Sequence, residues 1–193
     1  MRRTLAVASL LFLAVLTAPP AEAATVSTGE YFFSPNPIKV AEGGSVSWSN
    51  GGSFTHTSTQ NSPLALWNTG NIAPGNTSAA VTIRAAGSYA YHCAIHPTLM
   101  KGTVKVPIQI SPSKGSTSTT FTITLTSATQ SGFTYDVQMK VGSGSFTTWK
   151  PGVTTRTVTF SAAAGTYAFR SRLHKTSNGA TSGYSPAKTI TIS

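Results

Sequence analysis

The sequence predicts an all-β protein built from two successive β-sandwiches, and three observations support this fold class. Threonine, serine, valine and glycine are abundant, whereas charged residues make up only 9% of the chain. Short alternating segments recur between clusters of Gly, Pro, Asn and Ser. A polar stretch, SPSKGSTST, interrupts this pattern, and the alternation then restarts with FTITLTS. No stretch of helical period is longer than a turn or two.

The first residues of the chain set the expected compartment. Two arginines precede an apolar run over residues 5–16, and Ala-Glu-Ala at 21–23 has the small-x-small pattern of a cleavage site. These features predict a secretory signal peptide over residues 1–23. The apolar run is too short to span a bilayer, and no second run of about eighteen apolar residues follows. We therefore expect a protein without a membrane span that is secreted or periplasmic.

The alternating segments are expected as strands, and the break near Pro107 is expected as a domain boundary. The segments are residues 45–49, 79–83, 88–92, 103–106, 121–126, 134–141, 156–160, 167–173 and 189–192. The predicted domains are residues 24–106 and residues 107–193. This spacing of short strands and turns is typical of β-sandwiches.

One loop of the first domain concentrates metal-ligating side chains. Residues 91–102 read YHCAIHPTLMKG and place Cys93, the chain's only cysteine, with His96 and Met100 at the spacing Cys-x2-His-x3-Met. A thiolate, an imidazole and a thioether favour copper in an electron-transfer site, which needs a second histidine. His56 can supply it, because it follows the turn-rich NGGS stretch after the strand at 45–49. The predicted copper site is therefore His56, Cys93, His96 and Met100.

Each ligand also has an ordinary structural interpretation. A lone cysteine is usually a small buried apolar residue, and a lone methionine usually fills a core. The combination favours copper, because a single cysteine in an exported chain cannot pair within it and coordination protects it from oxidation. In such a site Cys93 supplies the strongest bond, His56 and His96 complete a trigonal plane, and Met100 is a weak axial ligand.

The stretch from about residue 30 to residue 106 resembles the small blue-copper proteins, the cupredoxins of the plastocyanin and amicyanin type. The resemblance is carried by YFFSPNPIKVAEGGSVSWSN, by THT around His56, by NIAPGNTSAAVTIRAAGSYAYHC and by GTVKV. It implies a Greek-key sandwich with one type 1 copper that carries single electrons, and no enzyme activity. Three residues separate His96 from Met100, whereas amicyanin-like loops usually have two and plastocyanin-like loops four. This spacing resembles that of azurin.

The resemblance also implies roles for residues around the copper. Thr57 stands where the family places a polar residue that ties the first-histidine loop to the cysteine loop. Ile95 stands where some relatives carry proline, which leaves an amide free to bond the thiolate. His96 is expected to reach the surface through an apolar patch with Pro97 and Leu99, and to be the electron port for a transient redox partner.

Residues 107–193 resemble a fibronectin type III or related immunoglobulin-like sandwich. Trp149 follows a strand and a glycine-rich turn, Tyr167 takes the place of a corner tyrosine, and SNGATSGYSPAKTITIS is similar to the last hairpin of that fold. This domain has eight basic residues against Asp136, a net charge of +7, whereas residues 24–106 have +2.

The strand at 167–173 is expected to carry a basic face. Alternation places Arg170, Arg172 and His174 opposite the mostly apolar set that should face the core. We prefer to interpret this row as a solvated face, and the functional interpretation is docking to an anionic surface or an acidic partner. Nucleic acid is not expected, because export separates the protein from most of it and no stacking aromatics interleave the basic run.

Other copper functions fit the sequence less well. Multicopper oxidases and nitrite reductases need further histidine clusters, a binuclear copper centre needs two cysteines, and a histidine brace needs histidine at the mature start. The remaining alternative is a secreted binding or adhesion protein whose cupredoxin domain binds or stores copper without transferring electrons. Of the other histidines, His92 is expected to point away from the copper, and His174 is expected to be exposed.

Overall fold

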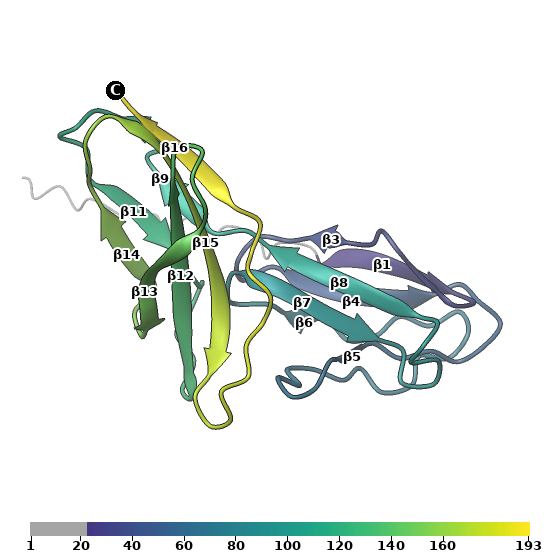
Figure 1. Ribbon diagram of the computed structural model, residues 1–193. Helices are drawn as coiled ribbons and strands as arrows, with labels where there is room; N and C mark the ends of the chain where they lie inside the picture. Colours follow the sequence, from purple (N-terminus) through teal and green to yellow (C-terminus); the bar gives the residue numbers. More distant parts are fainter. Residues whose placement is uncertain (1–22) are drawn as a thin grey trace, which may run out of the picture.

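The computed structural model describes residues 23–193, and these residues form strands and no helix (Figure 1). The predicted signal peptide lies, except for its last residue, outside the described residues. The first domain contains β1 (Ala24–Gly29), β2 (Phe32–Ser34), β3 (Ile38–Lys39), β4 (Ser45–Asn50), β5 (Thr59–Gln60), β6 (Val81–Thr82), β7 (Gly87–His92) and β8 (Lys101–Val106). The all-β prediction is confirmed. Within residues 23–193, no helix is both long and apolar enough to cross a bilayer.

The first domain is a sandwich of two four-stranded sheets, ordered β2-β1-β4-β6 and β3-β8-β7-β5. The pairs β1/β4 and β3/β8 are parallel, and the other pairs are antiparallel. Strand β7 shows why the sequence folds this way, because every second residue from Gly87 is buried, including Tyr89 and Tyr91. Tyr91 packs edge-on against Phe33 and Trp48 from the other sheet, so aromatic rings fill the space between the sheets.

The part of the chain predicted as the second domain follows β8. It contains β9 (Gln109–Ser111), β10 (Lys114–Gly115), β11 (Phe121–Thr124), β12 (Phe133–Val141), β13 (Thr147–Val153), β14 (Thr157–Phe160), β15 (Gly165–Lys175) and β16 (Lys188–Ile192). Its sheets are ordered β10-β16-β15-β12-β13 and β14-β11-β9. Trp149 packs against Phe160 and Phe169 between these sheets, and the Tyr167 hydroxyl donates to the Ala163 carbonyl at 3.0 Å, as a corner tyrosine does. The fibronectin type III assignment stays a prediction.

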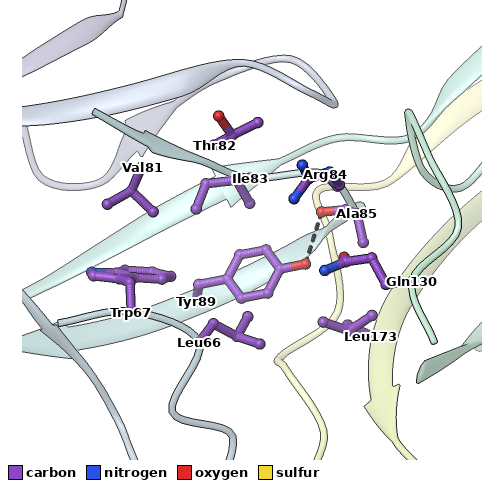
Figure 2. Close-up of a pocket in the computed structure, with 10 residues that line it drawn as sticks. All are labelled: Leu66, Trp67, Val81, Thr82, Ile83, Arg84, Ala85, Tyr89, Gln130 and Leu173. Atoms are coloured by element: carbon purple, nitrogen blue, oxygen red, sulfur yellow. Dashed lines mark hydrogen bonds between the residues drawn. The ribbon is translucent and has the colours of Figure 1, made fainter. Parts of the chain in front are cut away.

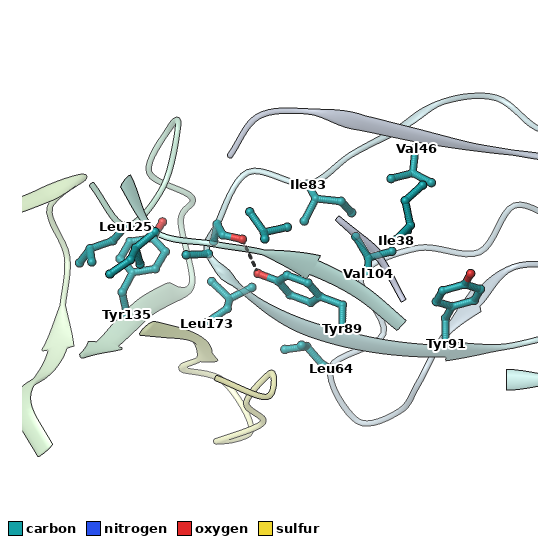
Figure 3. Packing of buried hydrophobic residues seen from close by; sticks show 14 of the residues in the cluster. Ile38, Val46, Leu64, Ile83, Tyr89, Tyr91, Val104, Leu125, Tyr135 and Leu173 are labelled. Carbon is teal, nitrogen blue, oxygen red and sulfur yellow. Dashed lines mark hydrogen bonds between the residues drawn. The ribbon is translucent and has the colours of Figure 1, made fainter. Parts of the chain in front are cut away.

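The two domains share a continuous apolar core at their junction. Ser88 at the start of β7 and Gly183 of the second domain exchange two backbone hydrogen bonds, of 2.8 and 2.9 Å. Figure 3 shows Tyr89 reaching toward Leu173, with Tyr135 beyond it in the second domain. Burial raises the pKa of the Tyr89 hydroxyl, which donates to the Ala85 carbonyl at 2.7 Å. Apolar side chains from both domains are therefore buried together at the junction, as they are in the core of a single domain.

A cavity of about 110 Å³ remains at this junction (Figure 2). Trp67 and Tyr89 form its wall on the first domain, and Leu173 and Gln130 close it from the second domain. From the junction, β7 runs to the opposite end of the first domain, where the chain turns back into β8 (Figure 1). The five residue-to-residue steps from Ser88 to Cys93 cover about 17 Å at the usual strand rise.

Candidate metal centre

The turn between β7 and β8 is the loop that the sequence predicts as the copper loop. It is closed by hydrogen bonds from the Cys93 amide to the Met100 carbonyl at 3.0 Å and from the Met100 amide to the His96 carbonyl at 3.0 Å. The His96 amide in turn donates to the Cys93 carbonyl at 3.1 Å. In the loop that these hydrogen bonds close, Cys93 and Met100 are completely buried and His96 is partly exposed. The cysteine therefore faces the core, while the histidine lies at the surface.

His56 reaches the same place from the loop between β4 and β5. Its amide and carbonyl both pair with Ile72, at 3.1 and 2.8 Å, which fixes the backbone at this position. The side chain of Asn50 ties the preceding loop together, because its amide group donates to the carbonyls of Phe54 and Ile72, each at 2.8 Å. His56 itself is fully buried.

Three of the four predicted ligands form one cluster of donor atoms. The Cys93 Sγ lies 3.8 Å from His56 Nδ1 and 3.7 Å from His96 Nδ1, and the ligand atoms of the three residues lie within 4.8 Å of one another. A first-row ion with bonds of about 2.3 Å to sulfur and about 2.1 Å to nitrogen, in a trigonal plane, separates such donors by about 3.8 Å. The residues present therefore fit a copper ion.

Electrostatics favours the neutral imidazole that a metal needs at His56. Burial lowers the pKa of His56, and the neighbouring His96 lowers it further, while the Glu30 carboxylate acts in the opposite direction. A neutral ring leaves one nitrogen free to bind a metal.

Thr57 ties the two ligand loops together, as expected. Its hydroxyl accepts a hydrogen bond from the Ala94 amide at 2.8 Å, and its own amide donates to the Cys93 sulfur at 3.3 Å. Within the described chain, the Ile95 amide makes no hydrogen bond to this sulfur. The amide that the sequence interpretation assigned to Ile95 is therefore supplied by Thr57, because the first-histidine loop lies directly against the sulfur.

Replacing Thr57 by valine tests this tie, since valine keeps the shape of the side chain and removes the acceptor. The Ala94 amide then loses its acceptor in a part-buried hydrogen bond beside the site, which costs about 0.5 to 1.5 kcal/mol. We expect copper still to bind, with a weaker affinity and a shifted reduction potential, measured by competition titration and voltammetry. Thr57→Ser, which keeps the hydroxyl, should behave as the wild type. Equal affinity and potential in both variants would contradict the role of the hydroxyl.

The remaining predicted residues are placed as follows. Met100 is buried at the end of the copper loop, and its role as axial ligand stays a prediction. His92 Nδ1 lies 2.7 Å from Asn61 Oδ1, outside the cluster of donors. His174 is not simply exposed, because its Nδ1 lies 3.7 Å from the Asp136 carboxylate. Sequence spacing gave no signal for that contact, which forms across the β12/β15 pair.

Two residues beside the site were not identified from the sequence. The Glu30 carboxylate accepts hydrogen bonds from the amides of Ser53 and Phe54, and these amides, that of Ser53 above all, lower the pKa of Glu30. The Tyr31 ring lies edge-on to His96 with the ring centres 5.0 Å apart. Both belong to the β1/β2 turn, which is far from either ligand loop in the sequence, so no local spacing indicates these contacts.

Comparison with known proteins bears on the first domain. Residues 21–107 match the profile of the copper binding proteins of the plastocyanin/azurin family. Among solved structures, an oxidized mutant of amicyanin is 25% identical, with a TM-score of 0.40, over 44% of this chain and 81% of that one. A purple cupredoxin from Nitrosopumilus maritimus is also 25% identical, with a TM-score of 0.39, over 43% and 98%. No curated protein matches the sequence.

Proposed function

We propose, on the premise that residues 21–107 form a cupredoxin domain of the plastocyanin/azurin family, that this protein carries single electrons between redox partners. One observation carries the proposal: His56, Cys93 and His96 bring two nitrogens and one sulfur together with the separations of a three-coordinate plane. We further propose that the protein does so outside the cytoplasm, after removal of the signal peptide predicted for residues 1–23.

Copper in such a site changes between Cu(I) and Cu(II), and the chain's part is to hold the ligands in one arrangement through that change. The buried Cys93 and His56 lie on loops joined by the Thr57 hydrogen bonds. Burial of both side chains also keeps water from the sulfur. Among the described residues, His56, Cys93 and His96 form the single cluster of this kind, which favours an electron carrier over an enzyme with several copper centres.

The surface around His96 supports a short-lived contact with a protein partner. Five of the six exposed large apolar side chains of the described residues belong to the copper loop, to the loop before His56, or to the β1/β2 turn and the first residue of β2. They are Tyr31, Phe32, Phe54, Ile95 and Leu99, with exposed fractions of 46 to 66%. An exposed apolar area of this kind marks an interaction site, and a small one suits transient exchange. We propose this apolar patch as the electron port.

The basic second domain is a weaker candidate for an anionic partner. Alternation along β15 is as predicted, with Arg170, Arg172 and His174 opposite the buried residues. However, Arg172 pairs with Asp136 at 3.0 Å, and Arg170 donates to Gln138 at 2.8 Å. The Arg170 guanidinium also stacks on aromatic rings from two loops, Phe146 at 4.2 Å and Tyr184 at 4.7 Å. These contacts favour a structural role for the row, and an anionic partner is supported only by the net charge of the domain.

The proposed function is tested by adding Cu(II) to the purified apoprotein. We expect an intense visible band from thiolate-to-copper charge transfer, a reversible one-electron potential and fast electron self-exchange. A colourless copper complex would contradict the type 1 site. A blue protein with slow self-exchange would instead support the alternative function, a binding or storage protein.

Replacing Leu99 by lysine tests the port. Leu99 is 66% exposed and lies three residues beyond His96, so the substitution adds a charge to the apolar patch without touching a ligand. Repulsion between two such charges should slow self-exchange by roughly tenfold at low salt, with an unchanged visible spectrum. The control is Val141→Lys in the second domain, where the native side chain is 54% exposed. Equal slowing of self-exchange in both variants would show that the electron port does not lie at Leu99.

Replacing Met100 by glutamine tests the axial ligand. An amide oxygen favours Cu(II) more than a thioether does, so copper should stay bound at a lower reduction potential and with an altered paramagnetic resonance spectrum. Voltammetry and resonance spectra of the copper-loaded variant measure both properties. If neither property changes, Met100 fills the core and is no ligand.

A further inference from the structure

The turn that connects β1 and β2 touches the loops of both histidine ligands. It consists of Glu30 and Tyr31, and Tyr31 has a φ of 69°, a left-handed conformation that residues other than glycine rarely adopt. A backbone held in this region by its surroundings is often found at functional sites. Here the conformation sends two consecutive side chains to two different loops of the metal centre.

Glu30 holds the loop that leads to His56. Its Oε1 accepts hydrogen bonds from the amides of Ser53 and Phe54, the latter at 3.3 Å. Asn50 holds the same loop from inside, because its Oδ1 accepts from the Gly52 amide at 2.9 Å. The segment before His56 is thus held by hydrogen bonds with Asn50 on its inner side and with Glu30 on its outer side. The outer hydrogen bonds all depend on the Glu30 carboxylate.

Tyr31 holds the ring of His96. The two rings meet edge to face, with an interplanar angle of 84° and centres 5.0 Å apart. Tyr31 is 46% exposed and His96 is partly exposed, so the two rings meet at the surface of the metal centre. The copper loop bonds the His96 backbone, and Tyr31 adds a contact that limits rotation of the ring itself.

Within residues 23–193, the His56 ring is not oriented by a hydrogen bond at its second nitrogen. Its Nε2 is buried and has no hydrogen-bond partner among the described residues, although a metal-bound histidine usually donates its second N–H to an acceptor. The rings of His56 and His96 are 5.3 Å apart, so movement of one changes the space available to the other. Ring orientation therefore depends on the position of the loops.

We propose that Glu30 and Tyr31 act as one clamp that positions both histidines, Glu30 through the loop before His56 and Tyr31 through ring contact with His96. Neither residue is a ligand. The proposal rests on the proposed function, because fixed imidazoles reduce the rearrangement that accompanies each electron transfer. It identifies the β1/β2 turn as a positioning element for the metal centre and as part of its partner-facing surface.

The test uses the full-length apoprotein with ¹³C-labelled histidine and measures the relaxation of each imidazole Cε1. We expect Tyr31→Ala to increase the motion of the His96 ring and leave His56 unchanged, and Glu30→Ala, which removes the oxygen that accepts from the Ser53 and Phe54 amides, to do the reverse. Tyr31→Phe should restore wild-type behaviour, because the ring makes the contact. Phe32→Ala is the matched control, since Phe32 is 52% exposed in the adjacent strand and is not stacked on either histidine. Tyr31→Leu replaces the alanine variant if that variant does not fold.

A second measurement uses the copper-loaded protein. The double variant of Glu30→Ala and Tyr31→Ala should exchange electrons about tenfold more slowly than the wild type, which corresponds to about 1.4 kcal/mol in the barrier. Histidine rings equally ordered in all variants, or a Phe32→Ala effect on imidazole relaxation as large as that of Tyr31→Ala, would overturn the clamp. A wild type that takes up copper without a blue band would contradict the proposed function, and the apoprotein measurements would still decide whether the clamp exists.

Discussion

Replacing Cys93 by serine is expected to abolish the visible absorption of the copper-loaded protein completely. The band arises from charge transfer between a thiolate and Cu(II), and a serine hydroxyl cannot supply that soft, ionised sulfur. The donor set would fall to two imidazoles with, at most, a weak thioether. We also expect a large loss of copper affinity, measured by competition with a chelator, together with the disappearance of the band.

The fold should survive this substitution. Cys93 directly follows β7, whereas the core of the first domain is filled by Trp48, Tyr89 and Tyr91, which the substitution leaves in place. Far-ultraviolet circular dichroism should therefore match the wild type. Cys93→Ala is the companion variant, because it removes the sulfur without introducing a hydroxyl. An intact blue band in either variant would refute the proposed site.

Replacing Leu173 by alanine is expected to destabilise the whole chain and leave the copper spectrum unchanged. Leu173 is 1% exposed and lines the junction cavity with Tyr89, so truncation enlarges an existing void (Figures 2 and 3). Leucine-to-alanine changes at such sites cost about 2 to 5 kcal/mol. Because the site is at the other end of β7, we expect the visible band and the potential to stay as they are.

Urea unfolding, followed both by the blue band and by circular dichroism, measures this effect. If the domains share one core, both signals should shift to lower urea together. Leu99→Ala is the control, because Leu99 is 66% exposed and such surface changes usually stay within about 0.5 kcal/mol. A loss of the circular dichroism signal while the blue band persists would show instead that the domains unfold independently.

Features that depend on near neighbours in the chain could be predicted from the sequence. Cys93 and His96 lie in one short loop, so their spacing alone indicates a shared site. The strands with strict alternation were also found, since β4, β7, β12, β15 and β16 each cover a predicted segment to within a few residues. The same alternation places Arg170 and Arg172 on one face of β15, as the structure shows. In these cases the period of two residues sets side-chain direction before any tertiary contact forms.

Features that depend on distant pairing could not be predicted in this way. Strands β1 and β2 were missed, because short strands of mixed polarity are stabilised by their neighbours, here by parallel pairing of β1 with β4. Arg170 contacts the rings of Phe146 and Tyr184, which come from loops on either side of its strand. The sequence predicted a row of basic side chains on this face, but it could not show that they stack on aromatic rings and pair with polar side chains.

The sequence by itself determined the all-β class, three donors suited to copper and the loop that carries two of them. Only the tertiary structure decided how these donors are held. Thr57 supplies the amide at the sulfur, and Glu30 and Tyr31 contact the two histidine loops, 23 and 65 residues along the chain from their partners Ser53 and His96. The reason is physical: ligand identity is a property of side chains, whereas ligand orientation depends on contacts that exist only when the sheets pack.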